Sequence, residues 1–394
     1  MGTKAGAGIS RHRDPKKAGR EAIQQAFKEA DLATCDLVIM YATIGHDQQT
    51  IVNAVRELAG DARLIGCSAE GVIAGGEIDE SNFAVAVMVI KSDELRFVPH
   101  LVTGLKERPG EVGEQLAAKL APALASDSLA VMLLGDGITI NFDKFNAAFE
   151  SSLGRRIPLI GGTAADNFEM KQTYQYLDGA VVSDAVMGML ISGDARIAWD
   201  VNHGCIPIDL ERKITRAKGN VIFEIDNLPV LEVLKDYLLA EEIDNWDQTV
   251  VNLCLGFRAP KSFHDDYDGY LIRFMPQRDV KEGSVVIPTE VAEGTSVWMT
   301  RRDHEKILLG CKRIGDNLKA VLAGQTPKLV LHFDCAGRGK FVFRDEEKRA
   351  ALALMRDQIS TTAPWIGFFT FGEIGPVNGQ NCFHNYTAVV AVLY

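Results

Sequence analysis

The same order of local patterns occurs three times along this chain of 394 residues. Each occurrence runs from an apolar strand through a turn into a helix. A second strand then leads into a corner of small residues, and a closing strand follows. The three occurrences occupy residues 36–90, 128–191 and 328–393. Because duplication preserves the order of elements while residue identities drift, this pattern predicts an α/β chain built from equivalent units.

The corners are the most similar parts of the three units. They comprise Leu64–Glu77, Leu159–Asn167 and Trp365–Gly375, and each combines a short apolar strand with glycines, small residues and a carboxylate. Small side chains leave backbone N–H groups open to a ligand, and glycine adopts backbone angles that other residues resist. We therefore expect the three corners to surround one small ligand.

The segment between the second and third units has a different character. Tyr270–Pro276 and Gly283–Pro288 have the pattern of antiparallel strands, and Asp303–Ala323 has that of a long amphipathic helix. This change places a domain boundary near residues 219–226. The sequence thus predicts an α/β (α+β) fold in which repeated strand–helix–strand–strand units form two sheet-containing domains.

Composition excludes several classes of protein. The net charge of −11 disfavours nucleic acid and anionic membranes as partners, and no apolar run approaches the roughly 18 residues that a membrane span needs. The polar segment 1–15 predicts a mobile tail without the apolar core of a signal peptide. The seven cysteines are odd in number and form no C-x-x-C pair, which favours reduced thiols and a cytoplasmic location.

The corners and several later segments resemble a known family. The segments that resemble the N-terminal FIST domain are Gly66–Gly71, Gly161–Asp166, Gly204–Pro207, Lys213–Thr215 and Val221–Leu234. The segments that resemble the C-terminal FIST domain are Asp334–Gly339, Gly367–Pro376 and Phe383–Thr387. The run Gly367–Pro376 is the most specific of them.

This resemblance implies a domain organisation and a function. A FIST N-terminal domain with two internal repeats would cover residues 16–222, and a FIST C-terminal domain residues 223–394. The family is regarded as an intracellular sensory module for small ligands, with amino acids proposed as ligands, and it often accompanies signalling proteins. A chain of both domains with no appended output domain is also similar to a haem-binding subgroup that senses nitric oxide and regulates a partner histidine kinase.

Candidate ligand-binding residues follow from the corners and the C-terminal motif. They are Gly66, Cys67, Ser68, Glu70, Gly162, Thr163, Asp166, Gly372, Glu373, His384 and Asn385. In an amino-acid sensor, Glu373 would hold the amine, and backbone N–H groups near Gly66 and Gly162 would hold the carboxylate.

For haem, one axial histidine beside a large apolar cavity suffices. Among the eight histidines, His203 is the preferred iron ligand because Gly204 and Cys205 follow it, where a cofactor face can approach closely. The Cys205 thiolate is the alternative ligand. We expect His46 and His304 to be exposed.

An enzyme is the third alternative. The chain contains no G-x-S-x-G elbow, Walker A loop or H-E-x-x-H motif, so we expect no catalytic activity. An enzyme of this sequence would use Cys67 as a nucleophile or Glu373 as an acid–base group. The open alternatives are therefore a haem sensor, a sensor of a small polar ligand, and an enzyme.

Overall fold

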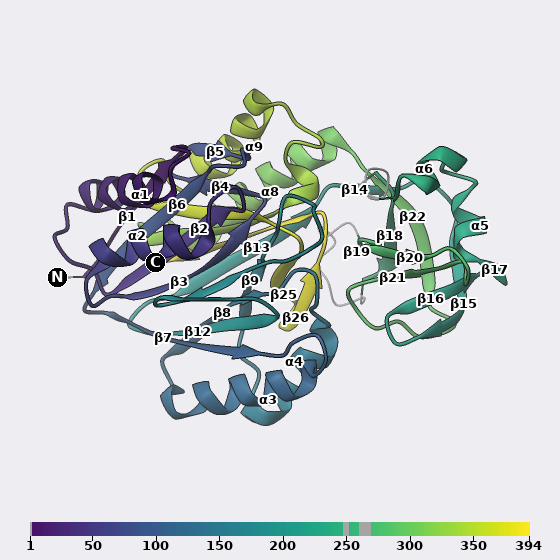
Figure 1. Cartoon of the computed structure of the whole chain (residues 1–394), viewed down its shortest axis with the longest axis horizontal. Coiled ribbons are helices and arrows are strands. Elements are labelled where there is room, and N and C mark those ends of the chain that lie inside the picture. Colours follow the sequence, from purple (N-terminus) through teal and green to yellow (C-terminus); the bar gives the residue numbers. More distant parts are fainter. Residues whose placement is uncertain (1, 247–251, 260–268) are drawn as a thin grey trace.

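The computed structural model describes residues 2–246, 252–259 and 269–394. In this part of the chain, three six-stranded sheets form one body, and a nine-stranded sheet stands beside it (Figure 1). The structure thus mixes helices and strands in several sheets, as the sequence predicts. No helix in the described ranges is long and apolar enough to cross a membrane.

Each six-stranded sheet belongs to one of three equivalent units. The first unit consists of β1 (Thr3–Ser10), α1 (Pro15–Ala30), β2 (Leu37–Thr43), α2 (Gln48–Ala59), β3 (Arg63–Ala69) and β6 (Val85–Ser92). The second consists of β7 (Leu95–Thr103), α3 (Pro109–Leu120), β8 (Ser128–Gly135), α4 (Phe142–Leu153), β9 (Leu159–Thr163) and β12 (Ala185–Gly193). The third consists of β13 (Ile197–His203), α8 (His304–Leu322), β23 (Leu329–Cys335), α9 (Asp345–Ile359), β24 (Trp365–Thr370) and β27 (Thr387–Leu393).

Strand pairing is the same in every unit. The two strands that flank the second helix are parallel, as β2 and β3 are, because the helix returns the chain to the same edge. The closing strand pairs antiparallel with the first of them and also with the strand that opens the unit. The predicted repeat is therefore present, and each unit also begins with a further strand and helix.

The hairpin after each corner leaves its own unit and completes the sheet of another. The hairpins are β4 (Gly71–Ala74) with β5 (Glu77–Asp79), β10 (Gln175–Leu177) with β11 (Ala180–Val182), and β25 (Glu373–Val377) with β26 (Gln380–His384). Strand β4 pairs with β24, β10 with β3, and β25 with β9. The three units therefore exchange hairpins in a closed cycle.

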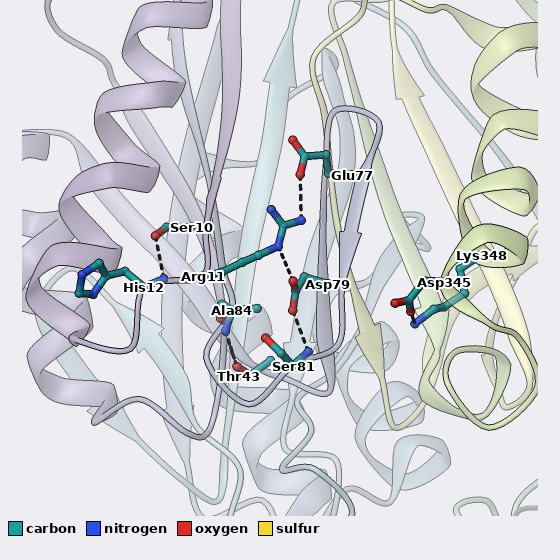
Figure 2. A network of polar contacts seen from close by, with 10 residues as sticks. All are labelled: Ser10, Arg11, His12, Thr43, Glu77, Asp79, Ser81, Ala84, Asp345 and Lys348. Carbon is teal, nitrogen blue, oxygen red and sulfur yellow. Dashed lines mark hydrogen bonds and ion pairs between the residues drawn. The ribbon is translucent and has the colours of Figure 1, made fainter.

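A side-chain contact ties the first of these hairpins to the start of the chain. Arg11, just after β1, donates from Nη2 to Glu77 Oε2 at 2.8 Å and also contacts Asp79 through Nε. Figure 2 shows the guanidinium between the two carboxylates, with Lys348 and Asp345 of α9 on the other side of the hairpin. Hairpin β4–β5 is thus held by the first and third units together.

The nine-stranded sheet is inserted into the third unit, between β13 and α8 (Figure 1). Its strands are β14 (Cys205–Pro207), β15 (Arg212–Lys218), β16 (Val221–Ile225), β17 (Leu228–Pro229), β18 (Cys254–Arg258), β19 (Tyr270–Arg273), β20 (Gln277–Asp279), β21 (Ser284–Val286) and β22 (Ser296–Arg302). The short helices α5 (Val230–Leu234) and α6 (Ala240–Asp244) lie with it. The expected boundary between residues 222 and 223 falls inside β16. The third unit also includes β13, which precedes the inserted sheet in the chain.

The prediction of a mobile tail at residues 1–15 is wrong. Strand β1 pairs with β6 along its whole length, from Thr3 opposite Ser92 to Ser10 opposite Val85. Gly6 and Gly8 in this strand lie against the α1 backbone, where a Cβ atom would be 2.4 and 2.2 Å from carbonyl oxygens. The Ala-Gly alternation that makes this close packing possible lacks the β-branched and aromatic residues that usually indicate a strand.

The inner faces of the three sheets form one apolar core, and the helices cover the outer faces (Figure 1). Buried side chains of β2, β8 and β23 belong to the same contact cluster. Four helices begin at side chains that accept a hydrogen bond from the first turn, as N-caps do. These N-caps are Asp14, Asp47, Asn141 and Asp303.

Candidate functional site

The three corners meet, and backbone hydrogen bonds link them in a ring. The bonds run from Ala165 N to Ser68 O (3.1 Å), from Phe371 N to Thr163 O (3.3 Å) and from Glu70 N to Phe369 O (3.0 Å). Each bond joins the same two positions of neighbouring units, so the corners are related by an approximate threefold rotation. They contact one another directly, and none of the cavities that we describe for residues 2–246, 252–259 and 269–394 is lined by all three.

A glycine lies at the same position of each corner strand because the neighbouring parallel strand passes very close. A Cβ atom on Gly66, Gly161 or Gly367 would lie 1.8, 1.9 or 2.2 Å from the carbonyl oxygen of β2, β8 or β23. Only glycine fits such a contact without a backbone shift. The glycines that suggested a ligand site from the sequence therefore serve strand packing.

Two candidate residues of the first corner are fully buried. Ser68 Oγ donates to Ala165 O at 2.8 Å and accepts from Tyr174 N at 3.0 Å, so it joins the first and second corners. Cys67 lies in the apolar core, and burial raises the pKa of its thiol well above the usual range. A reactive cysteine needs the thiolate form, so this site disfavours Cys67 as a nucleophile.

Glu70 completes the first corner with a buried carboxylate that pairs with an exposed lysine. Its Oε1 lies 2.7 Å from Lys340 Nζ in the segment between β23 and α9. Glu80, also buried, accepts from Lys340 N and pairs with Lys348 Nζ at 2.6 Å. Burial raises the pKa of Glu70 to about 7, although the Lys340 charge opposes the shift. The pair therefore connects the first corner to the third unit.

The raised pKa of Glu70 predicts a loss of stability as pH rises. The folded state holds this proton between the ordinary pKa of 4.5 and about 7, whereas the unfolded state releases it, so rising pH through that window favours unfolding. We expect Glu70→Gln to reduce the difference in unfolding free energy between pH 5 and pH 8 by about 2–3 kcal/mol. Urea titrations at several pH values measure it, with exposed Glu114→Gln as control. Equal pH profiles for both variants would contradict the assignment.

The second corner continues into a loop at residues 166–172, the 166–172 loop. The Asp166 carboxylate accepts from the backbone N–H groups of Met170, Lys171 and Gln172 at 3.0, 2.7 and 3.0 Å. Asp166 thus organises the loop. The other candidates here, Gly162 and Thr163, pair with the third corner, where Thr163 N donates to Gly372 O at 2.8 Å.

Glu373 of the third corner is completely buried. Thr370 Oγ1 donates to its Oε1 at 2.6 Å, and Thr387 N donates to its Oε2 at 3.1 Å. Burial raises its pKa well above the usual range, which favours the protonated form. Both oxygens are occupied by the protein itself, so this arrangement does not present Glu373 to the amine of a ligand.

The two candidates of the C-terminal motif have structural partners. His384 Nε2 bonds Gly375 O at 2.9 Å, and burial lowers the pKa of this imidazole to about 3. Asn385 donates from Nδ2 to Phe371 O at 3.1 Å, and its Oδ1 accepts from Phe274 N at 3.0 Å. Asn385 therefore links the third corner to the inserted sheet.

The surroundings of His203 do not fit a haem in this conformation. His203 is 1% exposed, and its Nδ1 accepts from Cys205 N at 3.1 Å. Cys205 is buried against Cys254, with the two sulfur atoms 3.9 Å apart. Neither His203 nor Cys205 lines a cavity that we describe in residues 2–246, 252–259 and 269–394, and these ranges contain no cluster of three metal-ligating side chains. A porphyrin needs an open apolar slot beside its ligand.

A polar cavity of about 480 Å³ lies beside the second corner, at the start of α2. We name it the helix-start cavity. It is lined by Ile44, His46, Asp47, Gln48, Gln49, Asp166, Glu169, Lys171, Gln172, Tyr174 and Val181. Its volume lies within the range of about 300–1,000 Å³ that is typical of small-molecule sites. Of the eleven candidate ligand-binding residues predicted from the sequence, Asp166 alone lines this cavity.

His46 in the wall of this cavity is buried, not exposed as expected. It is 3% exposed, its ring meets that of Phe83 edge-on at 5.5 Å, and the imidazole also interacts with the Phe83 backbone. Burial lowers its pKa, so the imidazole is neutral near pH 7 and can donate from one nitrogen and accept at the other. The signal in the sequence is its position, next to the N-cap Asp47.

Comparison with known proteins finds the two expected domains, in the expected order along the chain. Residues 36–228 match the FIST N domain, and residues 231–376 match the FIST C domain. An uncharacterized protein of Mycobacterium tuberculosis is 26% identical over 392 residues, which cover 98% of each chain. An uncharacterized protein of Methanocaldococcus jannaschii is 27% identical over 289 residues, covering 70% of this chain and 54% of the other.

The solved structures that align with this chain have lower sequence identity than these relatives. A cyanuric acid hydrolase from A. caulinodans aligns over 100% of this chain and 99% of its own, with a TM-score of 0.38 and 10% identity. A chorismatase aligns over the same shares, with a TM-score of 0.36 and 8% identity. The two domain matches together extend from residue 36 to residue 376, and the chain belongs to the FIST family.

Proposed function

We propose that this protein senses a small amine, such as an amino acid, which binds in the helix-start cavity. FIST domains suggest a small-ligand-sensing role in signalling. The observation that carries the proposal is the charge arrangement of this cavity. Carboxylates of Asp47, Asp166 and Glu169 line it, against the one cationic side chain, Lys171, among the lining residues. This excess of negative charge favours a ligand with an ammonium group.

The other polar groups of the cavity suit the rest of an amino acid. The start of α2 presents backbone N–H groups and the positive end of the helix dipole, which favour a carboxylate. Lys171 adds a cation, although Glu169 already lies 3.0 Å from its Nζ. Neutral His46 can accept a hydrogen bond from the ammonium group. A zwitterion of this size would thus meet both kinds of partner.

Glu169 is the best residue for a test because it is exposed and its removal should leave the fold intact. We expect Glu169→Gln to weaken binding of an amino acid by about twofold to fivefold, as is typical for one exposed charge pair. A thermal-shift screen of the twenty amino acids finds the ligand, and calorimetry compares the variants. Glu114→Gln, an exposed change on α3, should bind normally. No shift with any amino acid would reject the proposal.

The predictions of haem, nitric oxide and a kinase partner rest on resemblance to the family, and the prediction of location rests on the cysteines. Haem, nitric oxide and a partner histidine kinase stay predictions, as does a cytoplasmic location, and the closed surroundings of His203 give haem no support. The enzyme alternative also stays a prediction, and the burial of Cys67 and Glu373 weighs against it.

A further inference from the structure

One loop of the second unit lines two separate cavities. Asp166, Glu169, Lys171 and Gln172 of the 166–172 loop face the helix-start cavity. Phe168, in the middle of the same loop, lines a different cavity of about 20 Å³, which we name the aromatic pocket. The 166–172 loop thus connects the two cavities through one short stretch of chain.

The aromatic pocket joins the loop to the rest of the molecule. It is lined by Phe168, Phe274, Cys335, Ala336, Gly337, Thr370, Phe371, Asn385 and Tyr386. The centroid of the Phe168 ring lies 5.1 Å from that of Phe371, in the third corner, and 4.8 Å from that of Phe341. The volume is enough for about one water molecule, so the rings are nearly in full contact. Phe168 and Phe371 thus form part of the wall of this pocket.

The pocket also reaches the inserted sheet. Phe274, just after β19, lines it, and the Phe274 ring meets the Tyr386 ring edge-on at 6.2 Å. Asn385 joins the same two parts, since it bonds Phe274 N and Phe371 O. Phe168 and Phe274 therefore line the same pocket, one from the body and one from the inserted sheet.

The backbone of the loop is in an unfavourable conformation. Asn167, Phe168 and Met170 have φ of 56°, 58° and 52°, a region that non-glycine residues rarely adopt. Such a conformation is costly and persists only where its surroundings enforce it. Here the Asp166 carboxylate enforces it through three backbone N–H groups. A ligand that draws on this carboxylate would release the loop.

We infer that Phe168 transmits the state of the helix-start cavity to the inserted sheet. When Asp166 holds the loop, Phe168 fills the aromatic pocket and the contacts around Phe274 are tight. When the loop is released, Phe168 leaves and those contacts loosen. This inference rests on the proposed function only for the identity of the ligand that acts on Asp166.

Hydrogen exchange tests the connection without any ligand. We expect Asp166→Asn, which weakens the three loop bonds, to speed amide exchange of residues 269–276 by about tenfold, or about 1.4 kcal/mol of local opening. In a Phe168→Ala background, the same change should add nothing. Phe168→Leu replaces Phe168→Ala if the latter does not fold. Glu169→Gln, in the same loop, is the matched control and should leave this exchange unchanged.

Two results would overturn the inference. The first is that Asp166→Asn changes amide exchange within the 166–172 loop alone. The second is that Asp166→Asn still speeds exchange of residues 269–276 in the Phe168→Ala background. A second experiment adds the twenty amino acids as a mixture to the native protein. If none shifts the melting temperature, the proposed function fails, and the variant experiment still decides the connection. If one binds and exchange at 269–276 stays the same, the connection fails, and the binding proposal stands.

Discussion

Replacing Arg338 with methionine is expected to lower the free energy of unfolding by about 3–5 kcal/mol, the usual cost of removing one partner of a buried ion pair. Arg338 is 3% exposed, and its Nε lies 2.8 Å from Asp334 Oδ1 at the end of β23. Its other nitrogens donate to Asn202 O at 3.0 Å and Cys311 Sγ at 3.3 Å. Methionine fills similar volume and leaves the Asp334 carboxylate without its counter-charge. Urea or thermal unfolding of both proteins measures the change.

A double-mutant cycle with Asp334→Asn separates the ion pair from packing. We expect the double variant to be more stable than Arg338→Met alone, because the uncompensated charge is then gone. Burial raises the pKa of Asp334, but Arg338 and His332 lower it further, so its pKa is below the usual range. The native protein should lose this stabilisation as pH falls through the folded pKa, and the double variant should not. Additive single effects would contradict the assignment.

Replacing Gly161 with alanine is expected to destabilise the protein by at least about 3 kcal/mol, at the upper end of overpacking effects. Its Cβ atom would lie 1.9 Å from Leu133 O and 3.0 Å from Leu133 N, and both are backbone atoms of β8. Backbone cannot rotate away as a side chain can, so β8 and β9 must separate. Thermal unfolding, or the yield of folded protein if the variant does not fold, measures the loss.

Gly179 provides the matched control. It lies in the turn between β10 and β11, where a Cβ atom would meet nothing within 4 Å, and its φ is not positive. We expect Gly179→Ala to change the free energy of unfolding by less than about 0.5 kcal/mol. Equal losses in both variants would show that the close approach of β8 and β9 is not what requires glycine at position 161.

Much of the fold was predictable because it is encoded locally. The helix expected at Asp303–Ala323 agrees with α8 within a residue at each end, because an apolar stripe marks its buried face and Asp303 caps its start. The shared order of elements revealed the three units. The hairpin exchange was not predictable, because pairing between β4 and β24 depends on contacts that no local pattern contains.

The site was predictable only in part, for a similar reason. The sequence pointed to the corners, which do meet, but small residues there serve close strand packing, and the Glu373 carboxylate accepts hydrogen bonds from Thr370 and Thr387. Asp166 was found because it lies in a corner. His46 was missed because its burial depends on Phe83, which belongs to another part of the first unit.

The exchanged hairpins also decide when folding can finish during synthesis. Strand β4 is fully buried in the folded protein, yet its partner β24 leaves the ribosome long after it. Until then, its apolar side chains have no sheet to cover them, and the nascent protein carries an unfinished, association-prone surface. The first unit, although made first, is completed together with the last.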